Sequence, residues 1–278
     1  MANEALAQIP RSAWTPSCLR SPVISISRGT LAASLIWAGS LTADPIPVRH
    51  LEGLQHGFLI VRSEEGKVIA NGELSQQLHG DRVTSHLVYR FHDGSVQDET
   101  AVYSQRRMFH LLSHHIIQKG PAFKRSLDMS TSTANGQVTV HYDDKGEAKT
   151  ESGLLELPPD LANGIASTLL KNLPAGTGAT FSLVAATPKP RLVKLEITPD
   201  GQDSFRTGNV RHTADRYRVH VKIGGIAGAV APIIGKQPSD TRVWILQGAA
   251  PAFLKSEGPF YDGGPVWRIE LVSPTWKQ

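Results

Sequence analysis

Alternation of apolar and polar residues between short turns is the feature that most constrains the fold of this chain. From Gly57 to Ser152 the alternation has a period of two residues, which is typical of strands with one buried face. Between residues 83 and 92, for example, the apolar residues at 83, 87, 89 and 91 share one face. Turn signals such as Asp93-Gly94 and Asn135-Gly136 follow at short spacing. This spacing predicts neighbouring antiparallel strands in a meander.

One segment departs from the alternation, and it favours an amphipathic helix from about Pro159 to Asn172. Prolines suited to a first helical turn precede apolar residues at steps of four. This apolar stripe consists of Leu161, Ile165, Leu169 and Leu173. Gly164 within the expected helix costs up to about 1 kcal/mol relative to alanine. We therefore expect Gly164 to let another backbone segment come close.

Strand-like alternation returns after the expected helix, without a linker that would divide the chain. The runs cover residues 181–185, 191–198, 216–223, 242–246 and 266–272. About twelve strands would overtwist as a flat open sheet. The predicted fold class is therefore mainly β, a large curled antiparallel sheet or half-barrel that wraps one amphipathic helix.

The run from Gly224 to Gly235, GGIAGAVAPIIG, is apolar and rich in glycine, and it is too short to span a bilayer. One interpretation is a mobile or membrane-touching lip at the mouth of a cavity. The interpretation that we favour is a short buried helix or turn, because Pro232 and Gly235 punctuate the run as in a packed connection.

The stretch from Arg28 to Asp44 resembles a secretory signal, with a positive charge, a short apolar run and small residues that end at Ala43. It predicts a leader and signal at residues 1–43, a single β-rich domain at 44–278, and a periplasmic or secreted protein. An uncleaved anchor or a buried helix is the alternative. After cleavage the chain would be peripheral to a membrane at most. Cleavage would also remove Cys18, the only cysteine, so the core alone would hold the domain together.

The charge balance argues against nucleic acid as a partner. Loss of three arginines and one glutamate with residues 1–43 lowers the formal net charge from +4 to +2. A nucleic-acid-binding domain is expected to carry a larger and more concentrated basic excess.

No motif in the chain specifies catalysis, a metal site or a cofactor. The densest histidine group is His110, His114 and His115, but its surroundings resemble a strand. Residues four apart on a strand are roughly 13 Å apart, too far to share one ion. The chain has no Gly-x-Ser-x-Gly elbow and no phosphate-binding glycine loop. We therefore assign no catalytic residue, no metal ligand and no cofactor.

Aromatic residues and Gly-Pro pairs gather near the end of the chain. The aromatic residues there are Trp244, Phe253, Phe260, Tyr261 and Trp267. The segment Glu257-Gly258-Pro259-Phe260-Tyr261 resembles Lys119-Gly120-Pro121-Ala122-Phe123, but one five-residue match does not establish a duplication. Such aromatics fill a core, which is the interpretation that we favour, or line an apolar pocket.

Two motifs, QKGPAF at Gln118–Phe123 and GGPVWRIEL at Gly263–Leu271, add a family resemblance to this layout. The chain resembles an uncharacterised family of bacterial envelope proteins, a secreted β-rich domain of unknown function. Its layout is also similar to the half-barrels of the bacterial lipoprotein-carrier class, in which an open antiparallel sheet wraps a helix and shelters acyl chains. The resemblance supplies no catalytic residue.

These observations favour a non-enzymatic periplasmic protein that binds an apolar or amphipathic, lipid-like ligand, or an envelope protein partner, on the concave face of the sheet. The candidate cavity residues are Tyr89, Phe91, Phe109, Leu161, Ile165, Leu169, Trp244 and Trp267. A cofactor-independent enzyme that uses the same cavity is the first alternative, and a structural envelope protein without a small ligand is the second. An inward-facing titratable group such as His86, His114 or His220 would favour chemistry, whereas a wholly apolar lining would favour carriage.

Overall fold

The computed structural model describes residues 45–207, 210–224 and 237–272, all within one compact unit that spans residues 42–278. The expected signal at 29–43 and most of the Gly224–Gly235 run lie outside the described residues. In the described part, no helix has both the length and the apolar character needed to cross a membrane.

In the described residues, fourteen antiparallel strands form one sheet, and the predicted fold class is confirmed. The first eight strands are β1 Gln55–Arg62, β2 Val68–His79, β3 Arg82–Phe91, β4 Val96–Ser104, β5 His110–Lys119, β6 Leu127–Ser132, β7 Gln137–Asp144 and β8 Glu147–Leu154. Helix α1, Ala166–Lys171, precedes β9 Ala179–Val184, β10 Leu192–Thr207, β11 Val210–Lys222, β12 Thr241–Leu246, β13 Ala252–Pro259 and β14 Val266–Val272.

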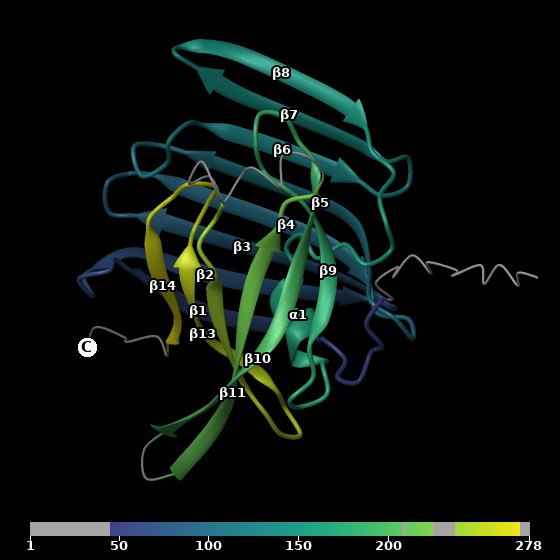
Figure 1. Cartoon of the computed structure of the whole chain (residues 1–278), viewed down its shortest axis with the longest axis vertical. Coiled ribbons are helices and arrows are strands. Elements are labelled where there is room, and N and C mark those ends of the chain that lie inside the picture. Colours follow the sequence, from purple (N-terminus) through teal and green to yellow (C-terminus); the bar gives the residue numbers. More distant parts are fainter. Residues whose placement is uncertain (1–44, 208–209, 225–236, 273–278) are drawn as a thin grey trace, which may run out of the picture. The chain divides into compact units, whose positions relative to one another are not determined.

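The sheet consists of two meanders joined through their first and last strands. Its order runs from β8 down to β1, then from β14 down to β9. The pairing of β1 with β14 places Phe58 opposite Val272 and Arg62 opposite Arg268. Strands β8 and β9 are the two edges, so the sheet is not closed. It curls around α1, and Figure 1 shows the helix on the concave side of the strands.

The helical segment is shorter than the sequence predicts, because α1 covers only Ala166–Lys171. Gly164 has a φ of +69°, which interrupts a right-handed helix before it reaches Leu161. Leu161 instead forms an isolated parallel bridge with Ser182 of β9. The buried side chain of Asn163 bonds the backbone N–H and carbonyl of Val184, at 2.9 Å each. The preceding segment therefore follows β9 rather than coiling.

The strand prediction also missed parts of the second meander. Strand β10 continues past Thr198 to Thr207, although Pro199-Asp200-Gly201 resembles a turn. The register shifts between Pro199 and Gln202, and Gly201 has a φ of +94°. The sequence signal for a turn is thus accommodated as a bulge inside a long strand. Strand β13, Ala252–Pro259, was not predicted.

Two apolar clusters fill the interior of the curl. The larger cluster surrounds the 161–173 segment and takes residues from both meanders, among them Tyr103, Met129 and Tyr217. All four residues of the expected apolar stripe are buried in it, at 1 to 5% exposure. The smaller cluster is rich in aromatic residues and includes Tyr89, Phe91 and Phe123.

Candidate functional site

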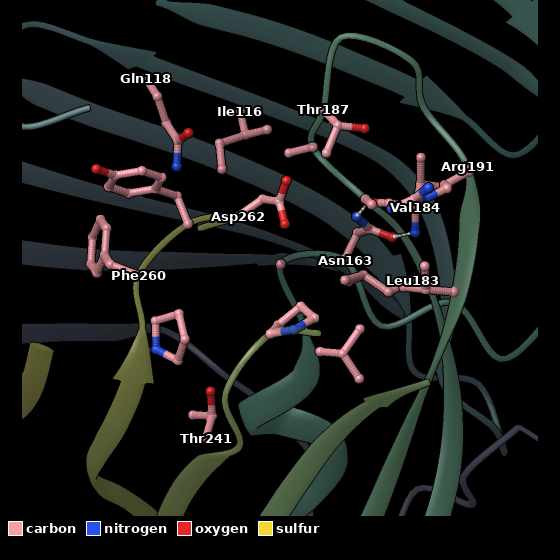
Figure 2. A pocket seen from close by; sticks show the side chains of 18 of the residues that line it. Ile116, Gln118, Asn163, Leu183, Val184, Thr187, Arg191, Thr241, Phe260 and Asp262 are labelled. Atoms are coloured by element: carbon pink, nitrogen blue, oxygen red, sulfur yellow. Dashed lines mark hydrogen bonds between the residues drawn. The ribbon is translucent and has the colours of Figure 1, made fainter. Parts of the chain in front are cut away.

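A cavity of about 260 Å³ lies on the concave face of the sheet, beside both apolar clusters. Its walls come from β4 and β5, the 163–164 segment, β9 with its loop to β10, the end of β11, residues 238–241, and the turn between β13 and β14. Figure 2 shows these side chains converging from elements far apart in the sequence. The cavity therefore exists only because the sheet curls.

Most of the lining is apolar. The apolar residues are Ile116, Leu183, Val184, Ala185, Ala186, Val193, Val221, Ile223, Pro238, Pro259 and Phe260. Phe260 is held in place by edge-to-face contacts with Tyr89 and Phe91, at centroid distances of 5.3 and 5.7 Å. This lining suits the apolar body of a small ligand.

The polar side of the cavity is an ion-pair-like contact between Glu99 of β4 and His114 of β5. His114 Nε2 lies 2.8 Å from Glu99 Oε1, and the two side chains are 2% and 19% exposed. Residues 99, 101 and 103 alternate onto the concave face, as do residues 114, 116 and 118, because successive side chains of a strand point to opposite faces. Burial raises the pKa of the Tyr89 hydroxyl, and the negative charge of Glu99 raises it further.

The two ring nitrogens of His114 differ in their hydrogen bonding. Nδ1 is buried and has no hydrogen-bond partner among the described residues. A proton on Nδ1 would be a buried donor without an acceptor, which is costly. We therefore place a proton on Nε2, which donates to Glu99 Oε1 at 2.8 Å.

The other polar residues of the lining hold the walls or lie at the rim. Gln118 donates to Gln97 Oε1 at 2.7 Å, and both side chains are buried. The Tyr261 hydroxyl donates to the Ala122 carbonyl at 3.1 Å. Arg191 and Asp262 also line the cavity and are exposed to solvent. Asn163 is already bonded to Val184, as described above.

Tyr261 joins the two Gly-Pro turns that the sequence analysis paired. Its ring lies 5.4 Å from that of Phe123, and Phe123 packs edge to face on Phe91 at 5.5 Å. The loop after β5 and the loop after β13 therefore meet, and the loop after β13 forms one wall of the cavity. The two turns that are similar in sequence are therefore also in contact.

None of the eight predicted cavity residues lines this cavity. Tyr89, Phe91 and Trp267 belong to the aromatic cluster behind Phe260, and Phe109, Leu161, Ile165 and Leu169 belong to the larger core. Ligand binding by these seven residues stays a prediction.

The eighth predicted residue, Trp244, lies on the face of β12 opposite Val243 and Ile245, which are in the larger core. Its indole Nε1–H donates to Asp203 at 2.6 Å, and the Lys255 ammonium lies 4.0 Å from its ring centroid. Trp244 is therefore turned away from the cavity. The sequence contained a signal for this orientation. Val243 and Ile245 flank Trp244 in β12, and neighbouring residues of a strand point to opposite faces of the sheet.

Of the three histidines named as indicators of chemistry, only His114 lines the cavity. His86 and His220 are partly exposed and pair with Asp98 and Asp240, at 2.8 and 2.7 Å. The sequence analysis missed Glu99. Glu99 could have been found from its position in the alternating pattern, because it shares one strand face with Ala101 and Tyr103. Across the described ranges, no group of three or more His, Cys, Asp or Glu side chains is arranged to hold a metal ion.

A second polar cluster joins Asp160, Ser182 and Lys194, residue types that also occur in hydrolases. Ser182 Oγ lies 2.8 Å from Asp160 Oδ1 and 2.7 Å from Lys194 Nζ. Ser182 is only 1% exposed and does not line the cavity, so a substrate carbonyl has no room to approach its hydroxyl. Through the bond between Asp160 and Ser182, the cluster links the segment before α1 to strand β9.

Comparisons with known proteins give one solved structure. Neither the protein-family models nor the curated proteins include a match. The chain is similar to a crystal structure described as a beta-barrel-like protein of domain of unknown function DUF1849 from Brucella abortus. That similarity has 11% sequence identity and a TM-score of 0.45, and covers 82% of this chain and 100% of that chain. That protein, like the family which the sequence resembles, is described as a domain of unknown function.

Proposed function

We propose that this chain is a non-enzymatic protein that binds a compact apolar or amphipathic, lipid-like ligand in the cavity beside Glu99 and His114. The observation that carries the proposal is a largely apolar cavity with one polar side, enclosed by elements of both meanders. Pockets for drug-sized ligands measure roughly 300 to 1,000 Å³. A volume of about 260 Å³ therefore suits one short chain or ring rather than several acyl chains.

The proposed place of action is outside the cytoplasm, in the periplasm or as a secreted protein. The support is the signal-like sequence from Arg28 to Asp44. An envelope protein could then be the source or the recipient of the ligand.

The test of ligand binding uses n-octanol as the probe and isothermal titration calorimetry as the measurement. Burial of each CH₂ contributes about 0.8 kcal/mol, and association costs at least about 4 kcal/mol, so we expect weak but saturable binding with a dissociation constant in the millimolar range. Ala186→Trp places a large ring in the lining and should weaken binding at least tenfold. Ala249→Trp, at an exposed position outside the lining, is the matched control and should bind like the wild type. Absence of saturable binding, or equal binding by both variants, would overturn the proposal.

A cofactor-independent enzyme is the second candidate, because His114 is a buried imidazole that faces a ligand-sized cavity. The test is hydrolysis of p-nitrophenyl octanoate by the wild type and by His114→Gln. Turnover that His114→Gln abolishes would favour the enzyme. Saturable binding of the ester without turnover would favour the binding protein.

A further inference from the structure

We propose that the cavity selects ligands whose polar end is a cation, such as a protonated amine, and that Glu99 is the residue that binds it. This inference rests on the proposed binding function and adds the chemical class of the ligand. Three features of the cavity support it: a carboxylate without a lysine or arginine partner among the described residues, a rigid support for that carboxylate, and an aromatic wall.

The first feature is the charge state of the polar side. Glu99 is 19% exposed, and within the described residues no lysine or arginine forms an ion pair with it. The hydrogen bond from His114 Nε2 orients the carboxylate. A largely buried negative charge without a cation is unfavourable in a low-dielectric interior. A ligand ammonium would supply the missing cation, whereas a ligand carboxylate would add repulsion.

The second feature is the rigidity of the pair. A β-carbon on Gly164 would lie 3.1 Å from His114 Cδ2 and 3.5 Å from Glu99 Oε1, so the backbone at Gly164 packs directly against both side chains. His114 is opposite Ala101 in the register of β4 and β5. The carboxylate is thus held in position before a ligand arrives, which lowers the cost of binding.

The third feature is the aromatic wall contributed by the turn between β13 and β14. Phe260 and Tyr261 both line the cavity, and the faces of aromatic rings attract cations. Asp262, next in the chain, adds a second carboxylate at the rim. The one arginine in the lining, Arg191, is exposed, so solvent screens its charge more than that of Glu99.

The experiment compares three probes with the same eight-carbon chain: n-octylamine, n-octanol and octanoate. Isothermal titration calorimetry at pH 7 and low salt should show octylamine binding at least tenfold tighter than octanol, and octanoate weakest. Glu99→Gln removes the charge and keeps the shape, and should bring octylamine to the affinity of octanol.

The matched control is Glu73→Gln, which removes the same charge from another His–Glu pair. His56 Nε2 lies 2.8 Å from Glu73 Oε1, but these side chains are 55% and 51% exposed and lie outside the cavity. This variant should keep the tenfold preference for the amine. If Glu99→Gln does not fold, the carboxyl ¹³C shift of Glu99 in the wild type replaces it, and octylamine but not octanol should move that resonance.

The outcomes separate this inference from the proposed function. Equal binding of octylamine and octanol would overturn the cation selectivity and leave ligand binding intact. Tightest binding of octanoate, lost in Arg191→Gln, would assign the polar end to an anion and also overturn the inference. Failure of all three probes to bind would overturn the proposed function itself.

Discussion

Gly164 affects both the backbone conformation before α1 and the packing of the candidate site. Its φ is +69°, and a β-carbon there would lie 2.7 Å from Ala101 Cβ. The first property favours glycine over any L side chain, and the second requires a residue without a side chain. Glycine at this position therefore ends the helical segment and lets it approach β4 and β5. The close contact involves side chains of these strands, whereas the sequence led us to expect another backbone segment.

Gly164→Ala should lower the free energy of unfolding by about 1 kcal/mol for the positive φ and by a further 1 to 3 kcal/mol for overpacking. Gly176→Ala is the matched control, because Gly176 also has a φ of +69° but its β-carbon would meet nothing within 4 Å. Chemical denaturation of both variants gives the difference. Equal losses would show that the packing against Ala101 and His114 is not tight.

At the scale of elements, Asp203 connects strands of the second meander on the side away from the core. It lies on β10, accepts the Trp244 Nε1–H at 2.6 Å from β12, and pairs with Arg216 of β11 at 3.1 Å. The bond from Trp244, followed by the positive charge of Arg216, holds the pKa of the Asp203 carboxyl below its ordinary value of 3.8.

A pKa that is lowered on folding stabilises the folded state above pH 3.8, and this contribution is lost as the pH falls through the lowered value. The carboxylate is 48% exposed, so we expect less than about 1 kcal/mol. Trp244→Phe should raise the pKa of Asp203 toward 3.8, as measured by a ¹³C NMR titration. An unchanged titration would show that the indole bond does not stabilise the carboxylate.

At the scale of the whole described unit, the 161–173 segment holds the two meanders together. The larger core takes Val83 and Met129 from the first meander, Tyr217 and Ile245 from the second, and Ile165 from the segment between them. Ile165 is 1% exposed and lies in contact with this core. A substitution of Ile165 should therefore destabilise both meanders.

Ile165→Asp would bury a carboxylate without a partner, at a cost of several kcal/mol, and should abolish cooperative folding or lower the melting temperature severely. Leu154→Asp makes a similar change at a side chain that is 76% exposed, and should alter stability by no more than about 0.5 kcal/mol. Thermal unfolding followed by circular dichroism compares the two. A melting temperature of Ile165→Asp close to that of the wild type would contradict the insertion of this segment.

The sequence by itself determined most of the strands, the antiparallel pairing and the burial of the apolar stripe. These features depend on local periodicity: side chains alternate along a strand, and the stripe at Leu161, Ile165, Leu169 and Leu173 has to be buried somewhere. The strand assignment of His114 also followed from its neighbours, and β5 confirms it.

Only the tertiary structure decided where the cavity lies and which side chains line it. Glu99 meets His114 because β4 and β5 pair in one particular register, and Phe260 lines the same cavity because the curl brings the β13–β14 turn across the sheet. Trp244 and Phe260 are both aromatic residues of the same chain end, yet the first is turned outward and the second inward. Composition cannot separate them, because register and curvature are set by contacts between residues far apart in the sequence.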